Sequence, residues 1–382
     1  MNINEESLEL HRKLRGKITI KGKVRIKTTN DLSLLYTPGV AEPCRIIAKD
    51  KSAVYDLTMK NNTVAIVTDG TRVLGLGDIG PEAALPVMEG KALIMKEFGN
   101  IDAIPICLNE KDPDQIVEIV KAIAPVFGAI NLEDISTPKV FDIEERLTNE
   151  LDIPVFHDDQ HGTAMVVLAG LINALKITGK KKGEIKVVVN GSGSAGHAIA
   201  KLLLAYGIAD ITIFDRNGAI YSGRPNLEQH KAKMAEITNK QQFKGVLKDF
   251  EGADAIISAT APGGLSHDAI RKMNEQKIVF ALANPISEIS LEESKQLGIV
   301  VFGTGRSDYP NQLNNSVIFP GFLRALLDLR VKRITDKMKI AASEAVAKLV
   351  SKEELAVGKI IPDTFDKRLV KRIVKGVKKS LD

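Results

Sequence analysis

The chain has 382 residues, 44% of them hydrophobic and 26% charged, with a net charge of +5. This length predicts two or three domains with cores of their own, and the small positive charge argues against a nucleic-acid-binding protein. No apolar run approaches the roughly 20 residues of a membrane span, and two cysteines, Cys44 and Cys107, without disulfide or metal spacing favour the cytoplasm.

The first half of the chain alternates between helical and strand patterns. Residues 5–14 predict a charged helix without the apolar segment of a secretory signal, and residues 31–43 predict a turn-rich loop. Apolar strands are expected at 64–67, 101–106, 128–132 and 153–156, and helices at 82–98, 113–123, 138–151 and 161–176. This alternation predicts α/β layering.

The most informative motif follows an apolar strand that begins at residue 187. The strand runs into a Gly-x-Gly-x-x-Gly fingerprint, a helix follows at 198–205, and a second strand at 211–214 ends on Asp215. This βαβ context predicts a dinucleotide site in which the helix N-terminus faces the pyrophosphate. The residues of the fingerprint are Gly191, Ser192, Gly193, Ser194, Ala195 and Gly196.

The choice between the two nicotinamide cofactors stays open. Asp215 is placed to accept hydrogen bonds from the ribose hydroxyls, which favours NAD, while Arg216 beside it could meet the 2′-phosphate of NADP.

The second half continues the α/β alternation and ends in helices. Strands are expected at 255–258, 278–281 and 300–302, and the pattern is helical from residue 319 onward. The basic stretch at 367–379 has helical spacing, which favours a solvated helix face over a polyanion-binding surface.

Acidic residues follow two of the predicted strands. Glu133 and Asp134 end the strand at 128–132, and Asp158 and Asp159 follow the strand at 153–156. Parallel strands bring such ends to one crevice, where four carboxylates would repel one another without a cation. Oxygen ligands suit Mg²⁺ or Mn²⁺. The alternative is that Asp134 and Asp159 cap helices. His157 and His161 could also be metal ligands, but hydrogen-bonded structural histidines are favoured.

Lys91 lies within an otherwise apolar helical stretch. Such a lysine usually extends its amine to water, but in a dry cleft its pKa would fall and it could act as a base.

Taken together, these motifs resemble the malic enzyme family, in its short microbial form. The resemblance runs from Tyr36-Thr37-Pro38-Gly39-Val40 to Phe319-Pro320-Gly321. The landmarks between are Gly75-Leu76-Gly77-Asp78, Glu89-Gly90-Lys91-Ala92, Asn131-Leu132-Glu133-Asp134-Ile135 and His157-Asp158-Asp159-Gln160-His161-Gly162-Thr163-Ala164. So many motifs in one order are far more specific than the fingerprint alone.

The resemblance implies oxidative decarboxylation of (S)-malate to pyruvate and CO₂, with reduction of NAD or NADP and a requirement for Mg²⁺ or Mn²⁺. Tyr36 matches the general acid, Lys91 the general base, and Asp158 the carboxylate that partners the lysine. Both Tyr36 and Lys91 would then need a pKa below roughly 10. The matched metal ligands are Glu133, Asp134 and Asp159. The matched substrate residues are Arg72, Asn284 and Asn315, with Asn284 also near the nicotinamide.

The fold class implied is α/β with two domains and C-terminal helices. Residues 1–157 would form an α/β malic domain, residues 158–318 a Rossmann-type doubly wound parallel sheet, and residues 319–382 helices packing back on the core. The resemblance also suggests a homodimer in which part of the N-terminal region crosses to the partner subunit. Three alternatives stay open: another NAD(P)-dependent dehydrogenase, a non-catalytic dinucleotide-binding regulator, and malolactic chemistry in which reduced cofactor is not released.

Overall fold

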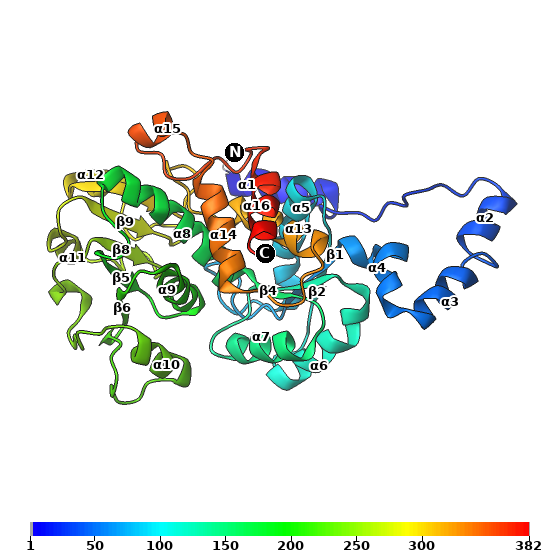
Figure 1. Ribbon diagram of the computed structural model, residues 1–382, viewed down its shortest axis with the longest axis horizontal. Coiled ribbons are helices and arrows are strands. Elements are labelled where there is room, and N and C mark those ends of the chain that lie inside the picture. The colour runs from blue at the N-terminus through cyan, green and yellow to red at the C-terminus, as the bar shows by residue number, and fades with distance from the viewer. Residues whose placement is uncertain (1–2, 382) are drawn as a thin grey trace.

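The computed structural model describes residues 3–381, and its longer strands form two separate sheets (Figure 1). The first sheet has the order β2-β1-β3-β4, and all its neighbouring strands are parallel. Its strands are β1 (Thr63–Thr68), β2 (Asp102–Cys107), β3 (Ala129–Leu132) and β4 (Val155–His157). Each strand lies where the apolar pattern predicts it, within two residues.

Helices cover both faces of the first sheet. The connections are α5 (Pro81–Gly99), α6 (Pro113–Ile123) and α7 (Lys139–Glu150). The apolar sides of α6 and α7 pack against one face in a core of their own, while α5 lies in the larger core with α13 (Phe319–Asp328). The carboxyl ends of β3 and β4 therefore lie side by side, as the sequence predicts.

The second sheet has the order β10-β9-β8-β5-β6-β7 and is parallel except for the short β7. Its strands are β5 (Lys186–Asn190), β6 (Asp210–Asp215), β7 (Gly218–Ala219), β8 (Ala255–Ser258), β9 (Lys277–Ala281) and β10 (Ile299–Thr304). Its helices are α9 (Ser194–Tyr206), α10 (Gln229–Ile237), α11 (His267–Arg271) and α12 (Leu291–Gln296). The strand order reverses between β5 and β8, which is where a doubly wound sheet opens a ligand crevice.

Helix α8 (Asp158–Thr178) joins the two sheets. It follows β4 directly and packs against α9 and α14 (Asp336–Ala347). By length and composition α8 could span a membrane, with a mean hydropathy of 1.3, so the sequence-based expectation that no segment approaches such a span was wrong. Two-thirds of that apolar stretch (67%) is buried within the protein, which is typical of a core helix.

The C-terminal helices return to both sheets. Helix α13 packs on α5, α14 packs on α8, and α16 (Leu369–Lys379) packs on both α13 and α14. The short α15 (Lys352–Ala356) lies between α14 and α16 in the chain. Five 3₁₀ turns complete the described helices: Lys51–Ala53, Met59–Asn62, Ala124–Val126, Leu247–Asp249 and Asn315–Val317.

The N-terminal segment forms an arm that extends from the body of the molecule (Figure 1). After α1 (Ile3–Leu14), the arm carries α2 (Thr29–Leu35) and α3 (Ala41–Lys49), and α4 (Val54–Leu57) leads back to β1. The expected loop at 31–43 is wrong at both ends, because Thr28 and Asp31 form a capping box that starts α2, and α3 begins at Ala41. Neither α2 nor α3 has a buried residue.

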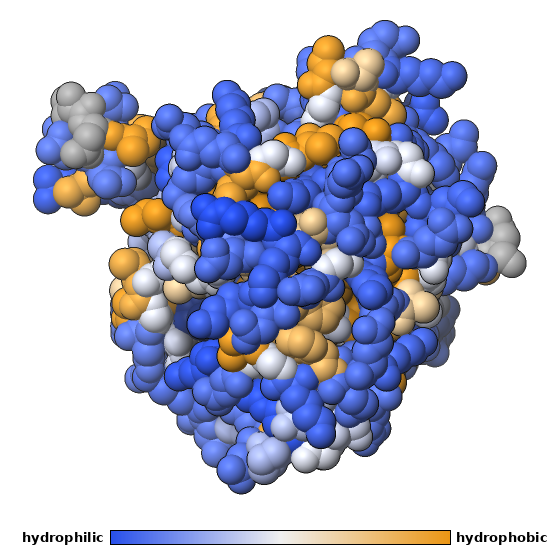
Figure 2. All heavy atoms as spheres, turned by 90° about the vertical axis from the view of Figure 1, so that its left-hand side faces the viewer, coloured by the Kyte–Doolittle hydropathy of each residue, from blue (hydrophilic) through white to orange (hydrophobic). Residues whose placement is uncertain are grey.

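The opposite end of the molecule has a different surface. Viewed from the side of the second sheet, the protein is mainly hydrophilic, with apolar patches scattered among polar side chains (Figure 2). The arm, by contrast, exposes several apolar side chains along its length, including Ile20 at 97% exposure and Leu34 at 66%.

Candidate active site

Three carboxylates meet where β3 and β4 end. Glu133 and Asp134 directly follow β3, and Asp159 lies in the first turn of α8. One oxygen from each of the three lies within 4.8 Å of the others. Glu133 and Asp134 are buried, and Asp159 is partly exposed. This convergence is the arrangement that the two strand ends predict.

The donor set fits a hard divalent cation. Asp134 Oδ2 is buried without a hydrogen-bond partner, and burial together with the charge of Asp159 raises the pKa of Asp134 to about 7. Asp134 also has a φ of 53°, in the left-handed region that costs a non-glycine residue about 1 kcal/mol or more. Three carboxylate oxygens facing one space are ligands of the kind that Mg²⁺ or Mn²⁺ takes.

The alternative role as helix caps is not what the side chains do. The N-cap of α8 is His157, and no side chain caps that helix; the N-cap of α7 is Pro138. Asp159 Oδ2 instead accepts a hydrogen bond from the Asp134 backbone N–H at 3.0 Å.

Lys91 on α5 enters the same acidic pocket. Its amine donates to Glu133 and, at 2.5 Å, to Asp158 Oδ2, and it lies 4.8 Å from the ring centroid of Phe319. The Lys91 side chain is 10% exposed, so it does not extend to water. Burial acts to lower the pKa of Lys91, but the charges of Asp158 and Glu133 outweigh it and raise the pKa above its ordinary value. The direction is opposite to the expected one, because the anions here face an ammonium group.

Asp158 is the most enclosed member of the pocket. It is 0% exposed, and its Oδ2 also accepts from Asn315 Nδ2 at 2.7 Å. Its carboxylate lies over Gly162 on the next turn of α8, where an added Cβ would be 1.8 Å from Asp158 Oδ1. Asn315 comes from the turn before α13, so the pocket joins residues far apart in the chain.

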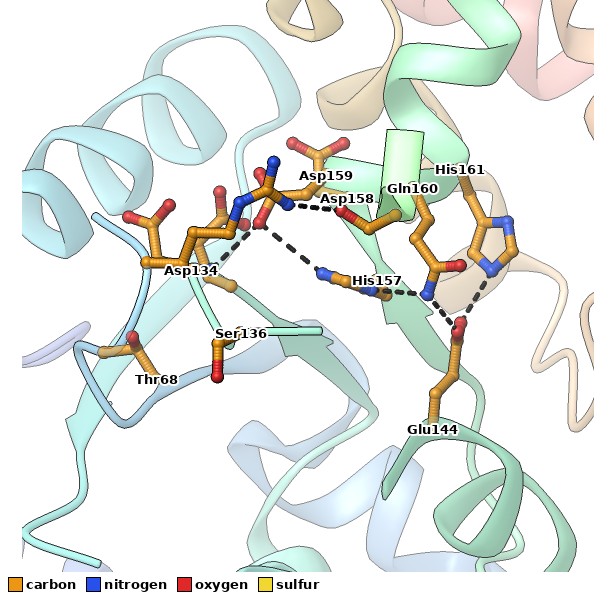
Figure 3. A network of polar contacts seen from close by, with 12 residues as sticks. Thr68, Asp134, Ser136, Glu144, His157, Asp158, Asp159, Gln160 and His161 are labelled. Atoms are coloured by element: carbon orange, nitrogen blue, oxygen red, sulfur yellow. Dashed lines mark hydrogen bonds and ion pairs between the residues drawn. The ribbon is translucent and has the colours of Figure 1, made fainter. Parts of the chain in front are cut away.

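The neighbouring histidines are hydrogen-bonded, as expected. His157 Nδ1 lies 2.6 Å from Gln160 Nε2, and His161 Nε2 lies 2.6 Å from Glu144 Oε1 (Figure 3). Neither belongs to the group of possible cation ligands found among residues 3–381.

The glycine fingerprint lies between β5 and α9, as predicted. Gly191 has a φ of 111°, and an added Cβ on Gly196 would lie 1.9 Å from the Gly191 carbonyl oxygen, so both positions require glycine. Gly193 is the N-cap of α9, and Ser194 is its first residue. The first N–H groups of α9 are therefore available to phosphate oxygens.

Arg72 connects the acidic pocket to the fingerprint, and the loop that carries it faces Asn284. The Arg72 backbone N–H donates to Asp134 O at 3.0 Å, while its guanidinium donates to Ser194 Oγ at 2.5 Å. Asn284 Nδ2 donates to Gly305 O at 3.0 Å. A Cβ added at Gly75 would lie 3.7 Å from Asn284 O, so the loop that carries Arg72 faces the Asn284 loop.

Asp215 ends β6, and positive groups surround it. Its Oδ1 accepts from Arg224 Nη2 at 2.9 Å, and Lys231 lies 3.7 Å from Oδ2. Arg216 is exposed and forms no ion pair with another residue of 3–381. One carboxylate oxygen of Asp215 is thus already engaged, and cations near it could meet a 2′-phosphate.

Family models match the two halves of the chain. Residues 15–148 match the malic enzyme N-terminal domain, and residues 160–379 match the malic enzyme NAD-binding domain.

The chain belongs to the malic enzyme family.

Relatives within that family include bacterial enzymes. The chain is 53% identical to a bifunctional malic/malolactic enzyme of Bacillus subtilis, covering 100% of this chain and 93% of the relative. It is 52% identical to an NAD-dependent malic enzyme of Geobacillus stearothermophilus, covering 99% and 78%. The crystal structure of an NAD-dependent malic enzyme from Thermotoga maritima superposes with a TM-score of 0.93 at 46% identity, covering 97% of this chain and 98% of that one. The predicted two-domain α/β fold is confirmed, whereas the domain limits drawn from the sequence stay predictions.

Tyr36 is the one expected catalytic residue that does not reach the acidic pocket. It follows α2 directly, on the extended arm, and is 65% exposed (Figure 1). Lys91, Asp158, Glu133, Asp134, Asp159 and Asn315 do come together within one chain.

Some residues of the site had no assigned role in the sequence analysis. Asn131 is buried in β3 and donates to Glu133 Oε2 at 2.8 Å; an amide within an apolar strand was a signal for it. Phe319 belongs to a family landmark but had no assigned role, and it contacts Lys91 from α13. Glu144 had no local signal, and it contacts Gln160 and His161 from α7.

Proposed function

We propose that this chain oxidatively decarboxylates (S)-malate to pyruvate and CO₂ while reducing NAD or NADP. The observation that carries this proposal is the buried Lys91 amine between Glu133 and Asp158. Glu133 also belongs, with Asp134 and Asp159, to the three carboxylates suited to a cation. Arg72 connects this pocket to the dinucleotide fingerprint. Membership of the malic enzyme family supports the same reaction.

Lys91 acts as the base in this proposal. A divalent cation held by Glu133, Asp134 and Asp159, when bound, polarises the C2 hydroxyl and stabilises negative charge on that oxygen. Lys91 must first lose its own proton to solvent. Asp158 then holds the amine in position to receive the hydroxyl proton, and Asn315 holds Asp158. Removing that proton allows the C2 hydride to pass to the nicotinamide.

Arg72 and Asn284 position the reactants. A guanidinium can bind a substrate carboxylate through two parallel hydrogen bonds, which fixes the face of C2 that meets the cofactor. The contact of Arg72 with Ser194 supports this role, because the same side chain touches the cofactor loop.

Tyr36 is the acid that protonates C3 after CO₂ leaves, and we propose that it acts in the partner subunit of a homodimer. Its 65% exposure on an arm without buried helix residues supports a partner site for it. Apolar side chains such as Ile20 and Leu34 would then be buried between the two copies.

A spectrophotometric assay tests the proposal. Malate would be supplied with NAD or NADP and with Mg²⁺ or Mn²⁺, with and without EDTA, while absorbance of reduced cofactor and pyruvate are followed. Cofactor reduction that stops on chelation supports it. Binding of cofactor without any malate-dependent reduction would favour a regulator. Activity that survives full chelation would favour another dehydrogenase.

Malolactic conversion is the second candidate, because one relative is named a bifunctional malic/malolactic enzyme. The same assay separates the two reactions: lactate formed with only trace cofactor, and without accumulation of the reduced form, indicates malolactic conversion.

Two unpaired cysteines support the expected cytoplasmic location.

A further inference from the structure

A chain of polar contacts leads from the acidic pocket to α7 (Figure 3). Glu144 Oε2 on α7 accepts from Gln160 Nε2 at 2.7 Å, and the same nitrogen lies 2.6 Å from His157 Nδ1. His157 Nε2 then lies 3.5 Å from Asp159 Oδ2. His157 is 0% exposed and Gln160 is 2% exposed, so water does not compete for these contacts.

Glu144 sets the direction of the hydrogen bonds in this series of polar contacts. Burial acts to raise the pKa of Glu144, but His161 outweighs burial and lowers that pKa to about 2, so the carboxylate is ionised. An ionised carboxylate only accepts hydrogen bonds, so Gln160 must present its NH₂ group rather than its oxygen. The same NH₂ group faces His157 Nδ1, which must therefore be the nitrogen without a proton.

Because Nδ1 faces an N–H group, Nε2 is the ring nitrogen of His157 that carries a proton. This nitrogen has no closer partner among residues 3–381, and its neighbour is Asp159 Oδ2. The same oxygen accepts from the Asp134 backbone N–H at 3.0 Å. Two N–H groups thus face Oδ2 of Asp159, which leaves Oδ1 for another ligand.

We propose that Glu144 is a positioning residue for the cation site: through Gln160 and the tautomer of His157, it orients Asp159 so that Oδ1 is presented to the metal. This inference rests on the proposed function, since it takes Asp159 to be a metal ligand. Residues that orient a ligand in this way commonly change metal affinity 10–100-fold when replaced.

The first test is Mn²⁺ binding without malate or cofactor, followed by the electron paramagnetic resonance of free Mn²⁺. Glu144→Gln leaves one acceptor oxygen where Gln160 and His161 both donate, and Gln160→Leu removes the donor to His157. Each should weaken Mn²⁺ binding by about tenfold. Glu145→Gln makes the same charge change at an exposed neighbour on α7 and should bind Mn²⁺ as the wild type does.

The second test reads the tautomer directly. Nitrogen-15 labelling of the six histidines, with His157→Asn to assign the signal, should give a His157 protonated at Nε2 in the wild type. Gln160→Leu should shift its proton towards Nδ1, an effect that a general loss of stability does not produce.

Each other outcome overturns the inference in a recognisable way. Weaker Mn²⁺ binding with an unchanged tautomer, or a wild-type His157 protonated at Nδ1, removes the positioning role while leaving the cation site. Wild-type protein that binds no Mn²⁺ removes the cation site of the proposed function and the positioning role with it.

Discussion

The acidic pocket and the N-terminal arm contain the two groups expected to move protons, and they differ in how the chain holds them. Lys91 is held by Glu133 and Asp158, in a pocket whose members come from α5, from the ends of β3 and β4, and from the turn before α13. Tyr36 lies on an arm whose helices α2 and α3 have no buried residue. The difference teaches that one chain brings Lys91 and the three carboxylates together, while it leaves Tyr36 exposed on the arm.

The largest expected effect is on the pocket side. Lys91→Ala should lower malate turnover by about 10²–10⁴-fold, because a positioned base contributes that much to the rate. Steady-state kinetics measure the loss, and fluorescence titration should show that cofactor still binds. Lys96→Ala is the matched control, because Lys96 is on the same helix but pairs with Asp102 at the surface; near-normal turnover by Lys91→Ala would remove lysine from the base role.

Mixing two inactive variants tests whether Lys91 of the pocket and Tyr36 of the arm act together from different subunits. If Tyr36 serves the partner subunit, a hybrid dimer of Lys91→Ala with Tyr36→Phe contains one complete site. Random assortment should then restore about one quarter of the wild-type activity. Subunits would be exchanged in mild denaturant and assayed against each variant alone. No recovery in proven hybrid dimers would mean that Tyr36 acts within its own chain or not at all.

A smaller effect is expected from pH on the cation site. The pKa of Asp134 is raised to about 7, so below pH 7 a cation must displace its proton. Apparent Mn²⁺ affinity should fall by about tenfold for each pH unit below 7 and level off above it. Calorimetric titration between pH 5.5 and 8 measures this slope. An affinity that is constant from pH 5.5 to 7 would show that Asp134 carries no such proton.

The smallest effect is expected from the arm on the fold of one chain. Leu34→Ser should change the free energy of unfolding of the monomer by less than about 0.5 kcal/mol, because Leu34 is exposed. The same change should weaken dimerisation, measured by analytical ultracentrifugation. Ser33→Ala on the same helix is the control, and a large loss of monomer stability would mean that the arm packs on its own body.

Sequence reasoning succeeded where the signal is local or follows from sheet geometry. The fingerprint at Gly191–Gly196 and the strands at β1 to β4 follow from apolar runs and glycine spacing. The meeting of Glu133 with Asp159 follows because the ends of neighbouring parallel strands share an edge.

The remaining features depend on contacts between distant parts of the chain. Asp31 and Thr28 start a helix where turn-forming residues suggested a loop, because a capping box outweighed the turn signal. Nothing local marks Glu144 as a partner of Gln160, since they meet only after α7 packs against β4, the strand that precedes α8. The pKa of Lys91 was expected to fall, and its rise depends on two anions from different strands.

At Gly162, the residue that would make helix α8 more stable conflicts with the position of the Asp158 carboxylate in the site. Replacing a glycine inside a helix by alanine ordinarily stabilises the helix by about 0.5–1 kcal/mol. At position 162 the added methyl group would occupy the space of the Asp158 carboxylate, which would have to swing away and release the Lys91 amine. Selection of variants only for survival of heating would therefore not require glycine at this residue. Selection for turnover would retain glycine.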